Sequence, residues 1–310
     1  MSPLLLFVLG IALLTLGGEL LVKNAALLAR ALGMPPLVVG LTVVAFGTSA
    51  PELAASLAAA LEGAPGIAYG NVVGSNLANL GLVLGLAALI RPLRVEARFL
   101  RREAPFMVAV ALLLAVSVWD GVVDRWEGAF FLFLLAGYLY LLLGDREPPE
   151  VLAEFAGAYG KGARRLVYRL FLLGLGVLFL TLGARSLVAG AVALAAALGV
   201  PDRVIGLSVV ALGTSLPELA AALVAVLRRE GDILLGNLIG SNVFNVLGIL
   251  GTVALVKPLV LGTPPAFDLA ALLLLSGLAW AFLWTGRRLG RREGALLFLL
   301  YLGYVGWIYS

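Results

Sequence analysis

The sequence predicts an all-α polytopic membrane protein with ten transmembrane helices, arranged as two inverted five-helix repeats. Three observations predict this fold class. The 310 residues are 62% hydrophobic and only 13% charged, against roughly 45–50% and 25% in soluble domains. Ten apolar runs approach or exceed the length that crosses about 30 Å of hydrocarbon as a helix. Residues 42–93 align without a gap with residues 208–259, and 27 of the 52 pairs are identical.

The ten runs are separated by charged residues or by proline and glycine. In chain order they cover residues 3–29, 36–61, 66–90, 104–119, 126–144, 168–198, 202–228, 231–256, 267–286 and 294–309. The first run lacks a basic leader region and is longer than the apolar part of a signal peptide. Its residues 15–17 (Thr-Leu-Gly) recur at 181–183, so we expect it to be retained as the first helix.

The longest polar segment lies between the fifth and sixth runs and contains Pro148 and Pro149. We take it as the boundary between the two halves. The predicted organisation is a first repeat at 1–144, a linker at 145–167 and a second repeat at 168–310. Because each half has five helices, an odd number, the second must enter the membrane in the opposite orientation. Secondary transporters commonly use such inverted repeats, with the substrate site at the repeat interface.

The loop charges predict the orientation in the membrane. With the N-terminus outside, 18 of the 22 basic residues fall in cytoplasmic loops, which satisfies the positive-inside rule. We therefore expect a multi-pass protein of the cell (inner) membrane, with both termini extracytoplasmic and the 145–167 linker cytoplasmic. The same loop bias explains the formal charge of +4, so nucleic acid is not an expected partner.

Each half carries a glutamate within an apolar run, at residues 47–52 (Gly-Thr-Ser-Ala-Pro-Glu) and 213–218 (Gly-Thr-Ser-Leu-Pro-Glu). Ionisable residues at membrane depth are costly and usually face an ion, a partner or a water-filled cavity. Pro51 lacks an amide hydrogen and clashes with the carbonyl four residues earlier. We therefore predict a helix break or kink across residues 47–49, and the same across 213–215, with carbonyl oxygens freed for a cation.

A second duplicated motif follows, Gly-Asn-x-x-Gly-Ser-Asn-x-x-Asn, at residues 70–79 and 236–245. Its serine and last asparagine are four residues apart and share one helix face. Together the motifs offer carboxylate, hydroxyl, amide and carbonyl oxygens, while the chain contains no cysteine and no histidine. All-oxygen sites suit hard cations; calcium accepts 6–8 such ligands flexibly, and magnesium is more demanding. Calcium fits best and sodium is a competitor, since two glutamates balance one divalent or two monovalent ions.

Structural roles compete with these functional ones. The glycine pairs of the second motif are common helix-packing devices, and Asn76 and Asn242 are equally interpretable as hydrogen bonds between helices. Glu52 and Glu218 could pair with a basic residue, but none lies near them in either motif helix. Glu19 and Arg185 occupy equivalent positions in the first and sixth runs and could snorkel or form ion pairs.

At these two motifs the sequence resembles the cation/calcium exchanger superfamily, and most closely its prokaryotic sodium/calcium exchanger branch. The resemblance extends over the whole chain through ten helices in two groups of five. It implies a Na⁺/Ca²⁺ antiporter that works by alternating access, with helices 1 and 6 sliding against a bundle that holds the ions. It implies Ca²⁺ and Na⁺ as transported substrates, membrane lipid as surroundings, no cofactor and no obligatory protein partner.

The resemblance also implies roles for residues at matching motif positions. Glu52 and Glu218 match the central acids, and Asn79 and Asn245 match the midplane flank of the site. The remaining matches are hydroxyl ligands and backbone carbonyl ligands: Ser49, Ser215, Ser75 and Ser241 for the former, and Thr48, Thr214, Ala45 and Ala211 for the latter. Potassium-dependent relatives carry aspartate at one or both of the asparagine positions, so the two asparagines argue against potassium co-transport.

Three other functions remain as alternatives. A Ca²⁺/H⁺ antiporter on the same fold is the runner-up. A cation channel would use rings of like residues around a pore, which internal inverted repeats do not favour. An intramembrane enzyme would need a nucleophile and base or a histidine metal site, and neither accompanies the glutamates.

Overall fold

A computed structural model describes residues 2–95, 97–144, 163–198, 213–262 and 264–308 of the chain. In the first half the helical elements are α1 (Pro3–Leu32), α2 (Pro36–Val39), the π-helical turn η1 (Gly40–Val44), α3 (Ala45–Leu61), α4 (Pro65–Leu77), the π-helical turn η2 (Ala78–Val83), α5 (Leu84–Ile90), α6 (Ala97–Arg101), α7 (Glu103–Ser117) and α8 (Arg125–Leu143).

In the second half they are α10 (Ala163–Ala197), α13 (Leu216–Leu227), α14 (Gly231–Phe244), the π-helical turn η4 (Asn245–Leu250), α15 (Gly251–Val256), α16 (Ala266–Trp284), the 3₁₀ turn η5 (Thr285–Arg287) and α17 (Arg291–Ile308). Four two-residue strands complete the described elements: β1 (Leu93–Arg94), β2 (Val122–Val123), β3 (Leu259–Val260) and β4 (Arg288–Leu289).

Local sequence signals account for several helix ends. Ser2 caps α1 by accepting a hydrogen bond from the amide of Leu5, with proline in the first turn. Gly33 ends α1 in the left-handed conformation (φ 64°), which glycine adopts without a steric penalty. At α8, Asp124 and Glu127 form a reciprocal capping box. These signals place the helix boundaries close to those that the apolar runs predict.

Each predicted run coincides with a described helical stretch, and the seventh is described only from residue 213 onwards. Within the described ranges, seven stretches are long and apolar enough to cross a membrane by length and composition. Of the other three runs, α7 has 15 residues, the described α13 has 12 and α17 has 18. Large apolar side chains are exposed along the outer helices, among them Phe133 and Leu178. The chain is therefore a multi-pass membrane protein.

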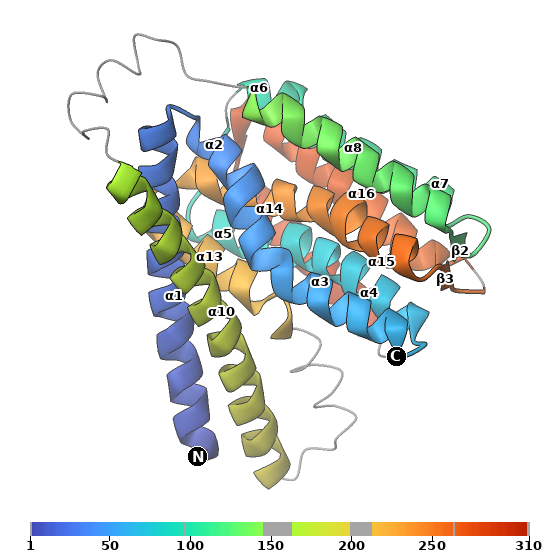
Figure 1. The fold of residues 1–310 in the computed structure, drawn as a ribbon, viewed down its shortest axis with the longest axis horizontal. Helices are drawn as coiled ribbons and strands as arrows, with labels where there is room; N and C mark the ends of the chain where they lie inside the picture. The colour runs from blue at the N-terminus through green and yellow to red at the C-terminus, as the bar shows by residue number, and fades with distance from the viewer. Residues whose placement is uncertain (1, 96, 145–162, 199–212, 263, 309–310) are drawn as a thin grey trace.

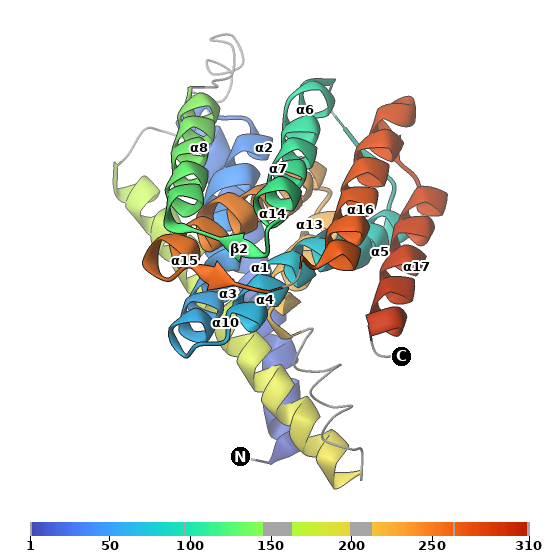
Figure 2. The same cartoon turned by 90° about the vertical axis from the view of Figure 1, so that its right-hand side faces the viewer.

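Helices α1 and α10 form a long pair that stands beside the remaining helices (Figure 1). Turning the molecule shows the same pair projecting past the bundle on the N-terminal side (Figure 2). Glycines line the contact between the two helices, where an added Cβ would lie 3.1 Å or less from atoms of the opposite backbone: Gly10, Gly17, Gly176, Gly183 and Gly190. The two backbones therefore lie in direct contact, as small residues allow in membranes.

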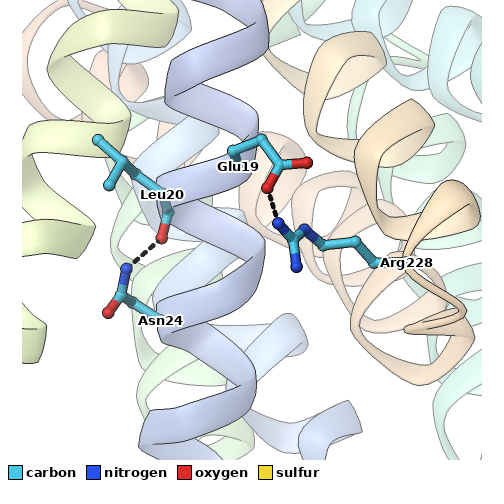
Figure 3. Close-up of polar contacts among 4 residues, drawn as sticks. All are labelled: Glu19, Leu20, Asn24 and Arg228. Carbon is cyan, nitrogen blue, oxygen red and sulfur yellow. Dashed lines mark hydrogen bonds and ion pairs between the residues drawn. The ribbon is translucent and has the colours of Figure 1, made fainter.

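The pair is joined to the bundle by an ion pair. Glu19, in the middle of α1, contacts the guanidinium of Arg228, which caps the C-terminal end of α13 (Figure 3). In the next turn of α1, Asn24 donates its amide to the carbonyl of Leu20 at 2.7 Å. Glu19 thus has a partner from the other half of the chain.

Two small antiparallel sheets tie the halves together. One pairs β1 with β4, and the other pairs β2 with β3. The largest buried apolar cluster runs through α4, α5, α7, α14, α15 and α16, and it encloses the segments that carry both motifs. The motif residues consequently lie in the best packed part of the protein.

Candidate cation site

The two motif glutamates are both fully buried. Glu52 lies on α3 with 1% of its surface exposed, and Glu218 lies in the first turn of α13 with 0% exposed. No described lysine or arginine forms an ion pair with either acid. A buried carboxylate without a counter-charge is strongly unfavourable. This arrangement calls for a cation from outside the chain.

The acids lie close enough for their charges to interact. Ser49, one turn before Glu52, points across to the second half, where its hydroxyl donates to Glu218 Oε1 at 3.5 Å. The Glu52 carboxylate is in turn bordered by Ser49, Ser75 and Asn245. The structure therefore brings both acids, both motifs and both halves of the chain to one place.

Several oxygen atoms at this place are buried and have no hydrogen-bond partner. They are Glu52 Oε1, Glu218 Oε2, Asn79 Oδ1 and Ser241 Oγ. Buried polar atoms nearly always have a hydrogen-bond partner. These four unpaired oxygens, two of which belong to the acids themselves, therefore need an explanation. Oxygen is the donor that Ca²⁺ and Na⁺ prefer. One nitrogen at the border of the site, Asn237 Nδ2, is also without a partner. Among the described residues no three acids cluster, so amides and hydroxyls would complete such a site.

Thr48 and Ala45 border the site from the first half. The Thr48 hydroxyl lies 3.2 Å from Asn237 Oδ1 and 3.4 Å from the carbonyl of Ala45, and it can donate to either. Asn71 donates to the carbonyl of Glu52 at 3.2 Å and to Ser56 Oγ at 2.8 Å, which ties α4 to the turn of α3 that carries the acid. Asn71 and Asn237 were not among the predicted site residues, although both belong to the duplicated motif.

The second half is described less completely. Ser215 is buried directly before α13, and Thr214 is half-buried in the turn that precedes it. Among the described residues no hydrogen bond joins the side chain of either to the acids, whereas the carbonyl of Ser241 lies 3.2 Å from the Asn245 amide that also contacts Glu52. Ala211 lies outside the described residues.

A break or kink was predicted across residues 47–49, and the break is wrong for the first half. Residues 47–49 remain helical within α3, which runs through Pro51 from residue 45 to residue 61. The irregular backbone lies one turn earlier, in the π-helical turn η1. In the second half Thr214 and Ser215 form a turn and α13 starts at Leu216, as predicted. Pro51 has no amide hydrogen to donate to the Gly47 carbonyl, so this carbonyl lacks its usual helical partner even without a break.

The two π-helical turns η2 and η4 are features that the sequence did not indicate. Asn79 is the second residue of η2, and Asn245 is the first residue of η4. Single π-turns inside α-helices occur often at functional sites. Both asparagines are fully buried, and the Asn245 amide lies 3.1 Å from Glu52 Oε2.

Glycines allow the halves to approach each other behind the site. A Cβ on Gly240 would lie 2.6 Å from the carbonyl oxygen of Leu41, and one on Gly236 would lie 2.4 Å from that of Leu37. Gly236 and Gly240 therefore have the predicted packing role, with α14 packed closely against η1. An added Cβ at Gly70 or Gly74 meets no described atom within 4 Å, so the corresponding pair in the first half does not make such a contact.

Comparisons with known proteins agree with this chemistry. The family model described as "Sodium/calcium exchanger protein" matches residues 2–144 and 168–310. The sodium/calcium exchanger MaX1 of Methanosarcina acetivorans is 34% identical over 338 residues, covering 97% of this chain and 97% of that protein. The inner membrane protein YrbG of Escherichia coli is 36% identical over 314 residues, covering 98% and 96%.

Solved structures of the sodium-calcium exchanger NCX_Mj have the same fold. The form soaked with zero Na⁺ and Ca²⁺ superposes with a TM-score of 0.87 at 33% identity, covering 99% of this chain and 98% of that one. The form soaked with 10 mM Na⁺ and zero Ca²⁺ gives a TM-score of 0.86.

Proposed function

Because this chain belongs to the sodium/calcium exchanger protein family, we propose that it is a secondary antiporter that exchanges Na⁺ for Ca²⁺ across the membrane. The observation that carries the proposal is the burial of Glu52 and Glu218 together, among unpaired oxygens and without a described counter-cation. Two carboxylates neutralise one Ca²⁺ or two Na⁺, so the two ions compete for the same charge. Ca²⁺ and Na⁺ are then substrates, and no cofactor is required.

The proposed ligands come from both halves. Glu52 and Glu218 supply the charge, and Ser49, Ser75, Ser241, Asn79 and Asn245 supply neutral oxygens. Ser215 supplies a hydroxyl, as Ser49 does. Thr48 and Ala45 contribute backbone carbonyls, with Thr214 and Ala211 as their counterparts in the second half. Asn79 and Asn245 leave the site with two acids, so we expect no dependence of Ca²⁺ flux on K⁺.

We further propose that the halves, residues 1–144 and 168–310, are inverted repeats that alternate access to this site. The small sheets support this arrangement. Adding 166 to the residues of β1 gives those of β3, and adding 166 to those of β2 gives those of β4. The offset therefore exchanges the sheet β1–β4 with the sheet β2–β3. Alternating access would let α1 and α10 move as a pair against the bundle.

We propose that both termini are extracytoplasmic and that the 145–167 linker is cytoplasmic. The chain has no cysteine, so single cysteines report their side of the membrane cleanly. Trp119→Cys, near β2, is expected to react with an impermeant maleimide added outside, and Arg287→Cys, near β4, only after permeabilisation. The reverse pattern would invert the topology.

The experiment that tests the function is ⁴⁵Ca²⁺ uptake into Na⁺-loaded proteoliposomes diluted into Na⁺-free, K⁺-free buffer with a protonophore present. Uptake that needs the Na⁺ gradient is expected. A parallel set of vesicles carries only a pH gradient and no protonophore. Uptake in that set alone would move the protein to Ca²⁺/H⁺ exchange and contradict the proposal.

A further inference from the structure

Two buried asparagines are hydrogen-bonded to the proposed ligands, and neither has a described hydrogen bond to the acids. Asn76 on α4 and Asn242 on α14 are each 3% exposed, and they are 166 positions apart in the chain. They meet directly, because Asn76 Nδ2 donates to the backbone carbonyl of Asn242 at 3.2 Å. This contact joins the two halves at their centre.

Each of these asparagines holds the amide nitrogen of a proposed ligand in the other half. Asn245 Nδ2 donates to Asn76 Oδ1 at 3.0 Å, and Asn79 Nδ2 donates to Asn242 Oδ1 at 3.4 Å. The two bonds correspond to each other under the 166-residue offset. The Asn242 amide nitrogen donates to Met107 Sδ at 3.5 Å. The hydrogen bond made by the amide nitrogen of each residue therefore fixes the direction of its acceptor oxygen, in Asn76 and in Asn242.

The consequence for Asn245 can be followed atom by atom. With its nitrogen on Asn76, its oxygen faces two other oxygens, Glu52 Oε2 at 3.1 Å and the Ser241 carbonyl at 3.2 Å. If the amide turned over, its nitrogen would donate to those oxygens, but its oxygen would meet Asn76 Oδ1 at 3.0 Å. Asn76 cannot turn over in response without losing the bond to Asn242. Without an ion, the turned amide would relieve the two oxygen contacts with Glu52 and Ser241. We therefore expect the bond to Asn76 to hold the oxygen inward when a cation occupies the site.

The same logic applies to Asn79. Its nitrogen is held by Asn242 Oδ1, and its Oδ1 is one of the buried oxygens without a partner. An amide presents a ligand oxygen to a cation only if its nitrogen is directed elsewhere. Outer hydrogen bonds of this kind orient ligands, and their loss typically costs about 10–100-fold in metal affinity.

We propose that Asn76 and Asn242 are positioning residues that turn the oxygens of Asn245 and Asn79 into the site, each acting on the opposite half. The inference rests on the proposed function, since it assigns a role within the same site. It also predicts that Asn76 and Asn242 affect Ca²⁺ affinity only when the ligand that each orients is an amide. A carboxylate has oxygen on both sides and needs no partner to orient it.

The test is a double-mutant cycle measured by ⁴⁵Ca²⁺ binding to purified protein. Asn76→Leu is expected to weaken Ca²⁺ binding about 10–100-fold, whereas in an Asn245→Asp background the same substitution should cost less than about 3-fold. Ser276→Ala is the matched control, because Ser276 lines the same small cavity as both asparagines but has no described partner; it should leave affinity unchanged.

Equal losses in both backgrounds would mean that Asn76 only packs the helices, and would overturn the inference. Should Asn76→Leu fail to fold, Asn242→Leu provides the same cycle against Asn79→Asp. If the unmutated protein bound no Ca²⁺, the proposed function would fail first, so the two failures are distinguishable.

A second inference rests on charges at the repeat-related positions. Glu19 on α1 pairs with Arg228 at the end of α13 (Figure 3). Under the 166-residue offset these two positions become Arg185 on α10 and Glu62 at the end of α3, with the signs exchanged. Both of these residues are described and exposed, and no ion pair joins them. One of two equivalent pairs is formed.

We propose that these pairs are alternate latches, with Glu19–Arg228 closed in the present state and Arg185–Glu62 closed in the opposite one. In an inverted-repeat transporter the two halves exchange environments between the outward-open and inward-open states. The Arg185–Glu62 pair should therefore form when the Glu19–Arg228 pair breaks. This inference also rests on the proposed alternation, but its readout is a covalent cross-link rather than transport.

The cysteine-free chain allows a direct test. The pairs Glu19→Cys/Arg228→Cys and Arg185→Cys/Glu62→Cys are each expected to cross-link with a short bifunctional maleimide. Each cross-link should block flux, and preformed cross-linking of one pair should prevent the other. If the second pair never cross-links in active protein, or both form together in one molecule, the latch is refuted.

Discussion

Replacing either Glu52 or Glu218 with glutamine is expected to abolish Ca²⁺ transport while leaving the protein folded. Glutamine keeps the size and one oxygen but removes the charge that balances the ion. Loss of an outer hydrogen bond already costs about 10–100-fold in metal affinity, so losing a charged ligand should reduce flux by at least about 100-fold. Both acids are essentially unexposed, so bulk water cannot take the place of the lost carboxylate oxygen.

We expect both variants to fold, because an unpaired buried acid lowers the free energy of unfolding of the ion-free protein. With no described basic partner, the neutral amide removes a desolvation cost instead of breaking an ion pair. The thermal midpoint in Ca²⁺-free buffer is therefore expected to stay level or rise, and added Ca²⁺ should no longer raise it. Glu127→Gln serves as control, since Glu127 lies in the capping box of α8 and should transport normally. Near-normal flux in either site variant would remove that acid from the site.

A leucine at Gly183 is expected to separate α1 from α10 and stop transport. The added Cβ would lie 2.8 Å from the backbone nitrogen of Leu14 and 3.1 Å from the carbonyl of Gly10. Backbone atoms cannot turn aside as a side chain can, so the whole helix must move. Overpacking of this kind costs roughly 1–3 kcal/mol. The measurement is the thermal midpoint in detergent together with Na⁺-driven Ca²⁺ flux.

Gly174→Leu on the same helix is the matched control. The two glycines are nine residues apart, which places them on opposite faces of an α-helix. A Cβ at Gly174 meets no described atom within 4 Å, so this variant should keep both its midpoint and its flux. If both variants behave alike, the close contact of α1 and α10 is not required for transport.

The positions of the helices could be predicted because they depend on local composition. A run that crosses hydrocarbon must be apolar for its whole length and must satisfy its own backbone, and both conditions are visible in a single segment. The fourth run was one of the two shortest predicted, and α7 is indeed a short helix of 15 residues. The two acids were equally visible, because charge at membrane depth stands out against any apolar background.

The sequence predicted irregular helical backbone near Pro51, but it did not predict where this irregularity lies. Sequence alone indicated that Pro51 disturbs its helix, yet the backbone of α3 continues through it and the irregular hydrogen bonds lie in η1. The neighbouring α14 packs on η1 through Gly236 and Gly240. Such packing comes from the other half of the chain, so no local pattern could report it.

By itself, then, the sequence determined the membrane class, the helix order, the duplication and the presence of two acids with an oxygen-rich motif beside each. Only the tertiary structure decided which atoms meet: Ser49 with Glu218, Asn245 with Asn76 and Glu19 with Arg228. The reason is physical. Helix formation in a membrane is settled within about 20 residues by hydrophobicity and backbone hydrogen bonding, whereas the site depends on side-chain orientations set by contacts between residues more than 160 positions apart.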